Sequence, residues 1–109
     1  MSVEQADVVD GMGMSKDGEN AVLVISDHLP WDEPGHLDQL AAKIGAYTNF
    51  ILGGGVIEAL PEAKGKPAVI QIVHQFDPSV SAGNFLGSVQ RQLKSVGIDL
   101  TLGSLPAGY

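Results

Sequence analysis

Histidine and carboxylate side chains that could perform acid–base or metal chemistry gather in one short stretch of this sequence, residues 26–36. The stretch reads Ser-Asp-His-Leu-Pro-Trp-Asp-Glu-Pro-Gly-His and holds two of the chain's three histidines. Imidazole transfers protons near neutral pH, and imidazole and carboxylate groups together bind zinc or manganese. Such a metal site needs three or four ligands that converge. The candidate ligands are Asp27, His28 and His36.

The spacing of these residues does not by itself specify a metal site. His28 and His36 are separated by a loop that contains proline, unlike the paired histidines of an HExxH helix. Asp32 and Glu33 have an ordinary role beside the start of a helix, because carboxylates interact favourably with the positive end of the helix dipole. His36 itself is expected in the first helical turn as a partly exposed surface residue. The sequence indicates no cofactor.

Two further side chains complete the set of candidates. His74 falls near the end of a predicted strand, on its apolar face, which is typical of a core or boundary residue. The functional alternative is an acid–base pair of His74 with His28 beneath the loop. Trp31, the only tryptophan, is expected to fill the gap between loop and sheet, or else to be an exposed anchor at an interface. The candidate ligand- or partner-binding residues are Asp27, His28, Trp31, His36 and His74.

Motifs for nucleophilic catalysis are not evident. Ser26 precedes Asp27 and His28 directly, but hydrolase triads assemble from distant segments with an oriented geometry. The chain has no GxSxG sequence and no cysteine, which excludes a nucleophile elbow, a thiol nucleophile and disulfides. The three glycines at 53–55 follow a predicted helix, so they indicate a helix end and not a phosphate-binding loop.

The hydrophobic pattern predicts the elements of the first half of the chain. Residues 8–14 and 21–25 are apolar runs joined by an Asp-Gly turn, which favours a β-hairpin. A helix is expected from about 34 to 52, with Asp32 or Glu33 as its cap and a proline in its first turn. Residues 56–60 fit either a short strand or one helical turn.

The second half predicts a strand, a helix and a strand. Residues 68–76 alternate and predict a strand whose apolar face carries Ala68, Ile70, Ile72, His74 and Phe76. Asp77 and Pro78 are expected to start the second helix, which ends at a glycine before the last strand, residues 98–102. The order ββαβαβ predicts an α+β fold, in which two amphipathic helices pack on one face of a mixed sheet of four or five strands.

Length and charge limit the organisation and the partners. The 109 residues suit one domain, predicted over 7–102, after a disordered start at 1–6 and before a mobile tail at 103–109. The net charge of −7 makes binding to nucleic acid or to an anionic membrane unfavourable. No apolar run approaches the roughly 20 residues of a membrane span, and no signal-peptide pattern is present, so a cytoplasmic location is expected.

Several segments together resemble a family of small bacterial proteins that is catalogued only as a domain of unknown function. The resemblance rests on Val-Asp-Gly-Met-Gly from Val9, on Ile-Ser-Asp-His-Leu-Pro-Trp from Ile25, on Pro-Glu-Ala-Lys-Gly-Lys from Pro61, and on Tyr47 and Phe50. It covers residues 7–102 and departs at the three glycines, which are more numerous than the family pattern has. It implies a bacterial, stand-alone cytoplasmic domain and no particular activity.

The sequence therefore leaves two classes of function. The first is a non-enzymatic binding or interaction domain, with an unknown protein or a second copy of itself as the partner, because the surface is acidic and no catalytic motif is present. A homodimer could form through a sheet edge or a helix face. The alternative is a small metal-binding or hydrolytic protein that uses Asp27, His28 and His36.

Overall fold

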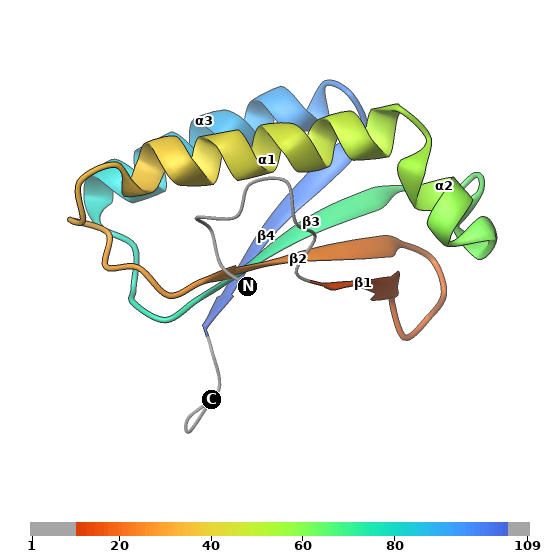
Figure 1. Ribbon diagram of the computed structural model, residues 1–109, viewed down its shortest axis with the longest axis horizontal. Coiled ribbons are helices and arrows are strands. Elements are labelled where there is room, and N and C mark those ends of the chain that lie inside the picture. The colour runs from red at the N-terminus through yellow and green to blue at the C-terminus, as the bar shows by residue number, and fades with distance from the viewer. Residues whose placement is uncertain (1–10, 105–109) are drawn as a thin grey trace.

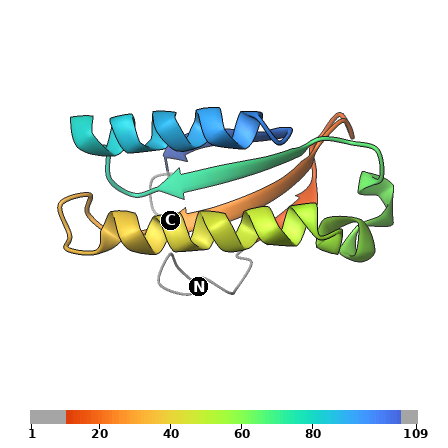
Figure 2. The ribbon, with the colours of Figure 1, turned by 90° about the horizontal axis from the view of Figure 1, so that it is seen from above.

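The computed structural model describes residues 11–104, which form one sheet and a layer of helices (Figure 1). The helices lie on one face of the sheet, as the view from above also shows (Figure 2). The elements in chain order are β1 (Gly11–Met14), β2 (Ala21–Asp27), α1 (His36–Leu52), α2 (Gly55–Ala59), the 3-10 helix η1 (Pro61–Ala63), β3 (Ala68–His74), α3 (Val80–Lys94) and β4 (Ile98–Ser104).

The four strands lie in the sheet in the order in which they occur in the chain, β1-β2-β3-β4. β1 is antiparallel to β2, whereas β2, β3 and β4 are parallel to one another. α1 and α3 run side by side in the same direction (Figure 2), because each follows a strand of the same orientation. The predicted α+β fold with a mixed sheet and two long helices on one face is confirmed.

The core lies between the sheet and the helices and follows from strict alternation in β2 and β3. Every second residue of both strands is buried, and the residues between them are half-buried on the other face. The register places Leu23 beside Ile70 and Ile25 beside Ile72, and all four side chains are fully buried. Successive side chains of a strand point to opposite faces, so this pattern alone fixes which face the helices cover.

The two long helices begin later than the sequence predicted. Gly35 precedes α1 with φ 80°, and no side chain caps that end, so neither Asp32 nor Glu33 has the predicted capping role. Ser79 caps α3 by accepting a hydrogen bond from the N–H of Ala82, in place of the predicted Asp77. A left-handed glycine and a nearer hydroxyl thus replace the carboxylates at both ends.

The three glycines end α1, as predicted, and also begin α2. Gly54 has φ 86° and precedes the short helix, which settles residues 56–60 as mainly helical and not as a strand. A Cβ atom at Gly55 would collide with the ring of Phe50. Gly54 is therefore required for its backbone conformation, and Gly55 is required for its close packing against Phe50.

The ends of the domain differ in part from the prediction. β1 begins at Gly11 within the described residues, and predicted strand residues 8–10 lie outside them. β4 continues through Gly103 and Ser104, which the sequence assigned to a tail, because both pair in register with β3. The predicted disordered start at 1–6 and the remaining tail, 105–109, lie outside the described part of the chain. None of the helices within residues 11–104 is long and apolar enough to cross a membrane.

The turn between β1 and β2 is stabilised by Asp17. Its carboxylate accepts a hydrogen bond of 2.6 Å from the Ser15 hydroxyl and one of 3.0 Å from the Glu19 N–H, and these bonds lower the pKa of Asp17 below its ordinary value of 3.8. Because the folded pKa is the lower one, the contribution of this carboxylate to stability is present above pH 3.8 and is lost as the pH falls through the folded value.

Substitution Ser15→Ala is therefore expected to raise the pKa of Asp17 toward 3.8, since the hydroxyl is the largest cause of the shift. An NMR titration of the Asp17 carboxyl carbon measures this change. Lys16→Ala, at the exposed neighbouring position, serves as the control and should leave the titration in place. An unchanged Asp17 titration in Ser15→Ala would contradict the hydrogen-bonded turn.

Candidate functional site

Asp27 and His74 lie side by side at the carboxyl ends of two parallel strands. Asp27 is the last residue of β2, His74 is the last residue of β3, and the two are register partners. Both belong to the alternating set that faces the helices, and their exposed fractions are 0% and 7%. The carboxyl edge of a parallel sheet is where ligands commonly bind in α/β folds, because the loops that follow the strands meet there.

His36 joins Asp27 from the first turn of α1. Its Nε2 lies 2.5 Å from Asp27 Oδ2, and neither side chain is exposed to solvent. Its Nδ1 lies 2.9 Å from the carbonyl oxygen of Pro30, and a carbonyl can only accept, so Nδ1 carries a proton. One further proton lies between Nε2 and the carboxyl group of Asp27, since two acceptors would not approach so closely.

This pair holds the β2–α1 loop against the sheet. The second oxygen of Asp27 accepts the N–H of Leu29 at 3.2 Å, so one carboxyl group fixes both the start of the loop and the start of the helix. The prediction that His36 is a partly exposed surface residue is wrong. Both of its ring nitrogens are used inside the protein, which makes it a support for the loop and leaves it no free atom for a substrate or a metal.

Trp31 covers this pair and remains partly exposed. Its ring stacks on His36 with centroids 4.4 Å apart and an interplanar angle of 28°. The indole N–H donates a 2.6 Å hydrogen bond to the carbonyl oxygen of Phe76, which ties the β2–α1 loop to the β3–α3 loop. Trp31 thus packs between the loop and the sheet, as predicted. The exposed part of its ring is accessible to a partner.

His74 lies under the edge of Trp31, with ring centroids 6.3 Å apart. Among the described residues, its Nδ1 is a buried side-chain nitrogen that has no hydrogen-bond partner. An unsatisfied polar atom in such a place costs about 1–3 kcal/mol. An apolar side chain would fill the same position without that cost, so packing alone does not account for a histidine here.

His28 does not join the other residues of the metal and acid–base hypotheses. His28 is exposed, and its Nδ1 lies 3.4 Å from the Gln75 side-chain oxygen, whereas His74 is buried against Trp31. Within residues 11–104, no three histidine, aspartate or glutamate side chains are arranged to hold a metal ion. The alternative site of Asp27, His28 and His36 therefore has no support from this geometry.

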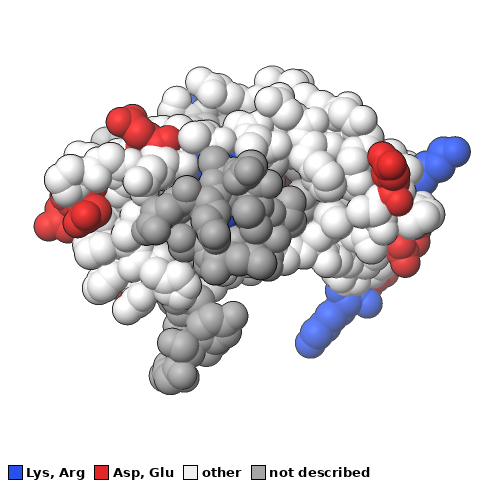
Figure 3. Space-filling model, in the orientation of Figure 1, with Lys and Arg blue, Asp and Glu red and all other residues white. Residues whose placement is uncertain are grey.

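The surface around Trp31 has an apolar centre and an acidic rim, and we call the whole of it the carboxyl-edge surface. Phe76 is 42% exposed and Val80, the first residue of α3, is 84% exposed. The surrounding loops and first helical turns carry exposed carboxylates, and residues 20–42 and 67–90 contain no lysine or arginine. Figure 3 shows acidic side chains at both ends of the visible face, and basic ones project beside the acids of the right end. The rim consists of Asp32, Glu33, Asp38 and Asp77.

Sequence reasoning missed two residues in this region. Phe76 was assigned to the buried face of a strand, but β3 ends at His74, which releases Phe76 to the surface. Lys43 is fully buried on α1, with its ammonium 6.0 Å from the centre of the Tyr47 ring, whose hydroxyl donates to the Val24 carbonyl. Helical spacing could have found Lys43, because it lies one turn before Tyr47 on the same face.

Comparisons with known proteins give a family without an assigned activity. The model of a family described as "Family of unknown function (DUF6572)" matches residues 1–105, nearly the whole chain. No curated protein and no solved structure matches the sequence.

Proposed function

We propose that this chain, which belongs to the DUF6572 family of unknown function, is a non-enzymatic interaction domain that binds a basic segment of a partner protein on its carboxyl-edge surface. The observation that carries the proposal is the aromatic centre of the partly exposed Trp31 and the exposed Phe76, within a rim of four carboxylates and no basic side chain. Aromatic residues are enriched at the centres of protein interfaces, and charged rims select the partner and speed its approach.

The buried contacts support a binding role because they hold Trp31 in one position. Trp31 rests on His36, His36 is fixed from two sides by Asp27 and Pro30, and the indole N–H is bonded across to Phe76. A side chain that is fixed before the partner arrives loses little conformational entropy on binding. The Asp27–His36 pair thus serves as the support of a binding surface.

The chemistry of the surface favours a segment that combines arginine or lysine with apolar residues. A guanidinium or ammonium group can lie over the face of an exposed aromatic ring while carboxylates of the rim neutralise it. Apolar side chains of the same segment can cover Phe76 and Val80, which are exposed in the free protein. A segment of this kind would bury the aromatic centre and leave no unpaired positive charge.

Binding of a short peptide of alternating arginine and leucine tests the proposal. The peptide has no aromatic residue, so the fluorescence of Trp31, the single tryptophan, reports contact directly. Replacing the four rim acids by their amides (Asp32→Asn, Glu33→Gln, Asp38→Asn, Asp77→Asn) is expected to weaken binding about tenfold or more, because several rim pairs of ~0.2–1 kcal/mol each are lost.

The matched control neutralises four exposed acids outside the surface, Glu19→Gln, Glu58→Gln, Glu62→Gln and Asp99→Asn, and so changes the net charge equally. It should weaken binding by less than about threefold. Phe76→Ala, which changes no charge, should also weaken binding if the aromatic centre takes part. Equal losses in the two sets of amide variants would show mere attraction to an acidic protein, and a peptide that leaves the Trp31 fluorescence unchanged would overturn the proposal.

A further inference from the structure

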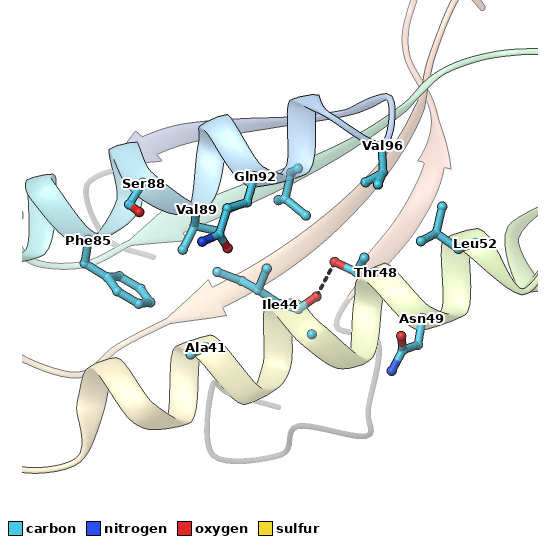
Figure 4. A pocket seen from close by; sticks show the side chains of 12 residues that line it. Ala41, Ile44, Thr48, Asn49, Leu52, Phe85, Ser88, Val89, Gln92 and Val96 are labelled. Carbon is cyan, nitrogen blue, oxygen red and sulfur yellow. Dashed lines mark hydrogen bonds between the residues drawn. The ribbon is translucent and has the colours of Figure 1, made fainter.

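An apolar groove runs between α1 and α3 on the side of the helices that faces away from the sheet (Figure 4). Its volume is about 530 Å³. The lining residues lie within 41–52 of α1 and within 85–96, which covers α3 and the turn that follows it, and they recur with the same helical spacing. Ile44 and Leu93 are its buried members. The hydroxyl of Thr48 donates to the Ile44 carbonyl within the helix, so it needs no partner from solvent.

The lining of the groove carries no charged side chain, although the chain has a net charge of −7. Two copies of so acidic a protein repel each other, and they can approach most closely where charge is absent. Interface centres are depleted of charged residues for the same reason. The groove is thus a surface on which a second copy can dock without burying an unpaired carboxylate.

The two ends of the groove differ in shape. Leu52 and Val96 stand at one end, 57% and 47% exposed, and Figure 4 shows them together. Toward the other end α1 offers only Ala41 and Gly45, and a Cβ atom added to Gly45 would meet nothing within 4 Å. We call this open space over Ala41 and Gly45 the hollow; the ring of Phe85 from α3 borders it (Figure 4). The large exposed Leu52 at one end of α1 and the small residues toward the other make α1 complementary to a reversed copy of itself.

We propose that two copies of the chain pair through this groove about a two-fold axis that crosses the helices, with α1 antiparallel to α1 of the partner subunit. In this arrangement Leu52 enters the hollow beside Ala41 and Gly45 of the partner subunit, and the reverse contact forms by symmetry. The proposal does not depend on the basic partner of the carboxyl-edge surface, because the groove and that surface consist of different residues.

Electrostatics favour the antiparallel arrangement over the parallel one. The acidic rim lies at the end where the helices start, whereas beyond the end of α1 the exposed lysines Lys64 and Lys66 balance the exposed acids Glu58 and Glu62. An antiparallel pair places each acidic end over the end of the partner that carries lysines, whereas a parallel pair stacks the two acidic ends. Antiparallel helices also oppose their dipoles favourably.

Light scattering after size exclusion tests whether the groove is the interface. The wild-type chain is expected to form a dimer that dissociates on dilution, and Gly45→Arg should raise the dimer dissociation constant by at least about tenfold by placing a charged chain in the hollow. Gly83→Arg is the matched control, because Gly83 is an exposed glycine of α3 with equally open space but does not line the groove.

Cross-linking tests the orientation, and the chain has no cysteine of its own to interfere. A mixture of Ala41→Cys and Leu52→Cys chains should cross-link under mild oxidation, whereas a mixture of Leu52→Cys and Val96→Cys should not. The opposite result would overturn the antiparallel arrangement. A wild-type monomer at high concentration, or dissociation by Gly83→Arg equal to that by Gly45→Arg, would overturn the groove as the interface, whatever the basic peptide does.

Discussion

Asp27→Ala is expected to lower the free energy of unfolding by about 3–5 kcal/mol, the range for removing one partner of a buried, hydrogen-bonded pair. The substitution removes the carboxylate that Nε2 of His36 and the N–H of Leu29 both contact, at a place where the side chains of Asp27 and His36 are fully buried. Domains of this size have roughly 5–15 kcal/mol of stability in total, so the loss is severe. Urea denaturation followed by Trp31 fluorescence measures it.

Asp27→Asn separates loss of hydrogen bonds from loss of charge. The amide oxygen can accept from the Leu29 N–H while the amide nitrogen donates to Nε2 of a neutral His36, so both contacts survive. We expect a cost of about 1 kcal/mol for this variant. A loss under about 1 kcal/mol for Asp27→Ala would contradict the buried pair, and equal losses for the two variants would show that the charge of Asp27 is what stabilises the loop.

Ile72→Ala is expected to cost about 2–5 kcal/mol, because it leaves a cavity in the middle of the core. Ile72 is fully buried in the parallel strand β3 beside Ile25 of β2. Val73, the next residue, faces away from the helices and is half-buried, so Val73→Ala should cost about 1 kcal/mol or less. Chemical denaturation of both variants checks the difference, and equal costs would contradict a sheet covered by helices on one face only.

The sheet was predictable from the sequence because its pattern is local. Burial alternates strictly through β2 and β3, and the sequence shows this alternation through the apolar residues Leu23, Ile25, Ile70 and Ile72. The helix starts were less predictable, since several residues near each start can cap a helix. Asp77 and Ser79 compete for the start of α3, and only the path of the chain after β3 decides for Ser79.

The candidate site was predictable in composition and not in geometry. The sequence singled out Asp27, Trp31, His36 and His74, and the structure brings these four together. The sequence alone could not show that both ring nitrogens of His36 are hydrogen-bonded, because their partners are a side chain at a strand end and a loop carbonyl. The groove was likewise hidden, since helical periodicity does not tell which edge of an apolar stripe meets the sheet and which stays open.

The strand order also bears on how the chain emerges from the ribosome. Each strand pairs only with the strands before and after it in the chain, so no strand has to be inserted between two that are already paired. A domain generally folds as one unit, and an isolated hairpin is only marginally stable. The strands of this sheet nevertheless leave the ribosome in the order in which they pair, and each long helix arrives just before the strand that follows it in the sheet.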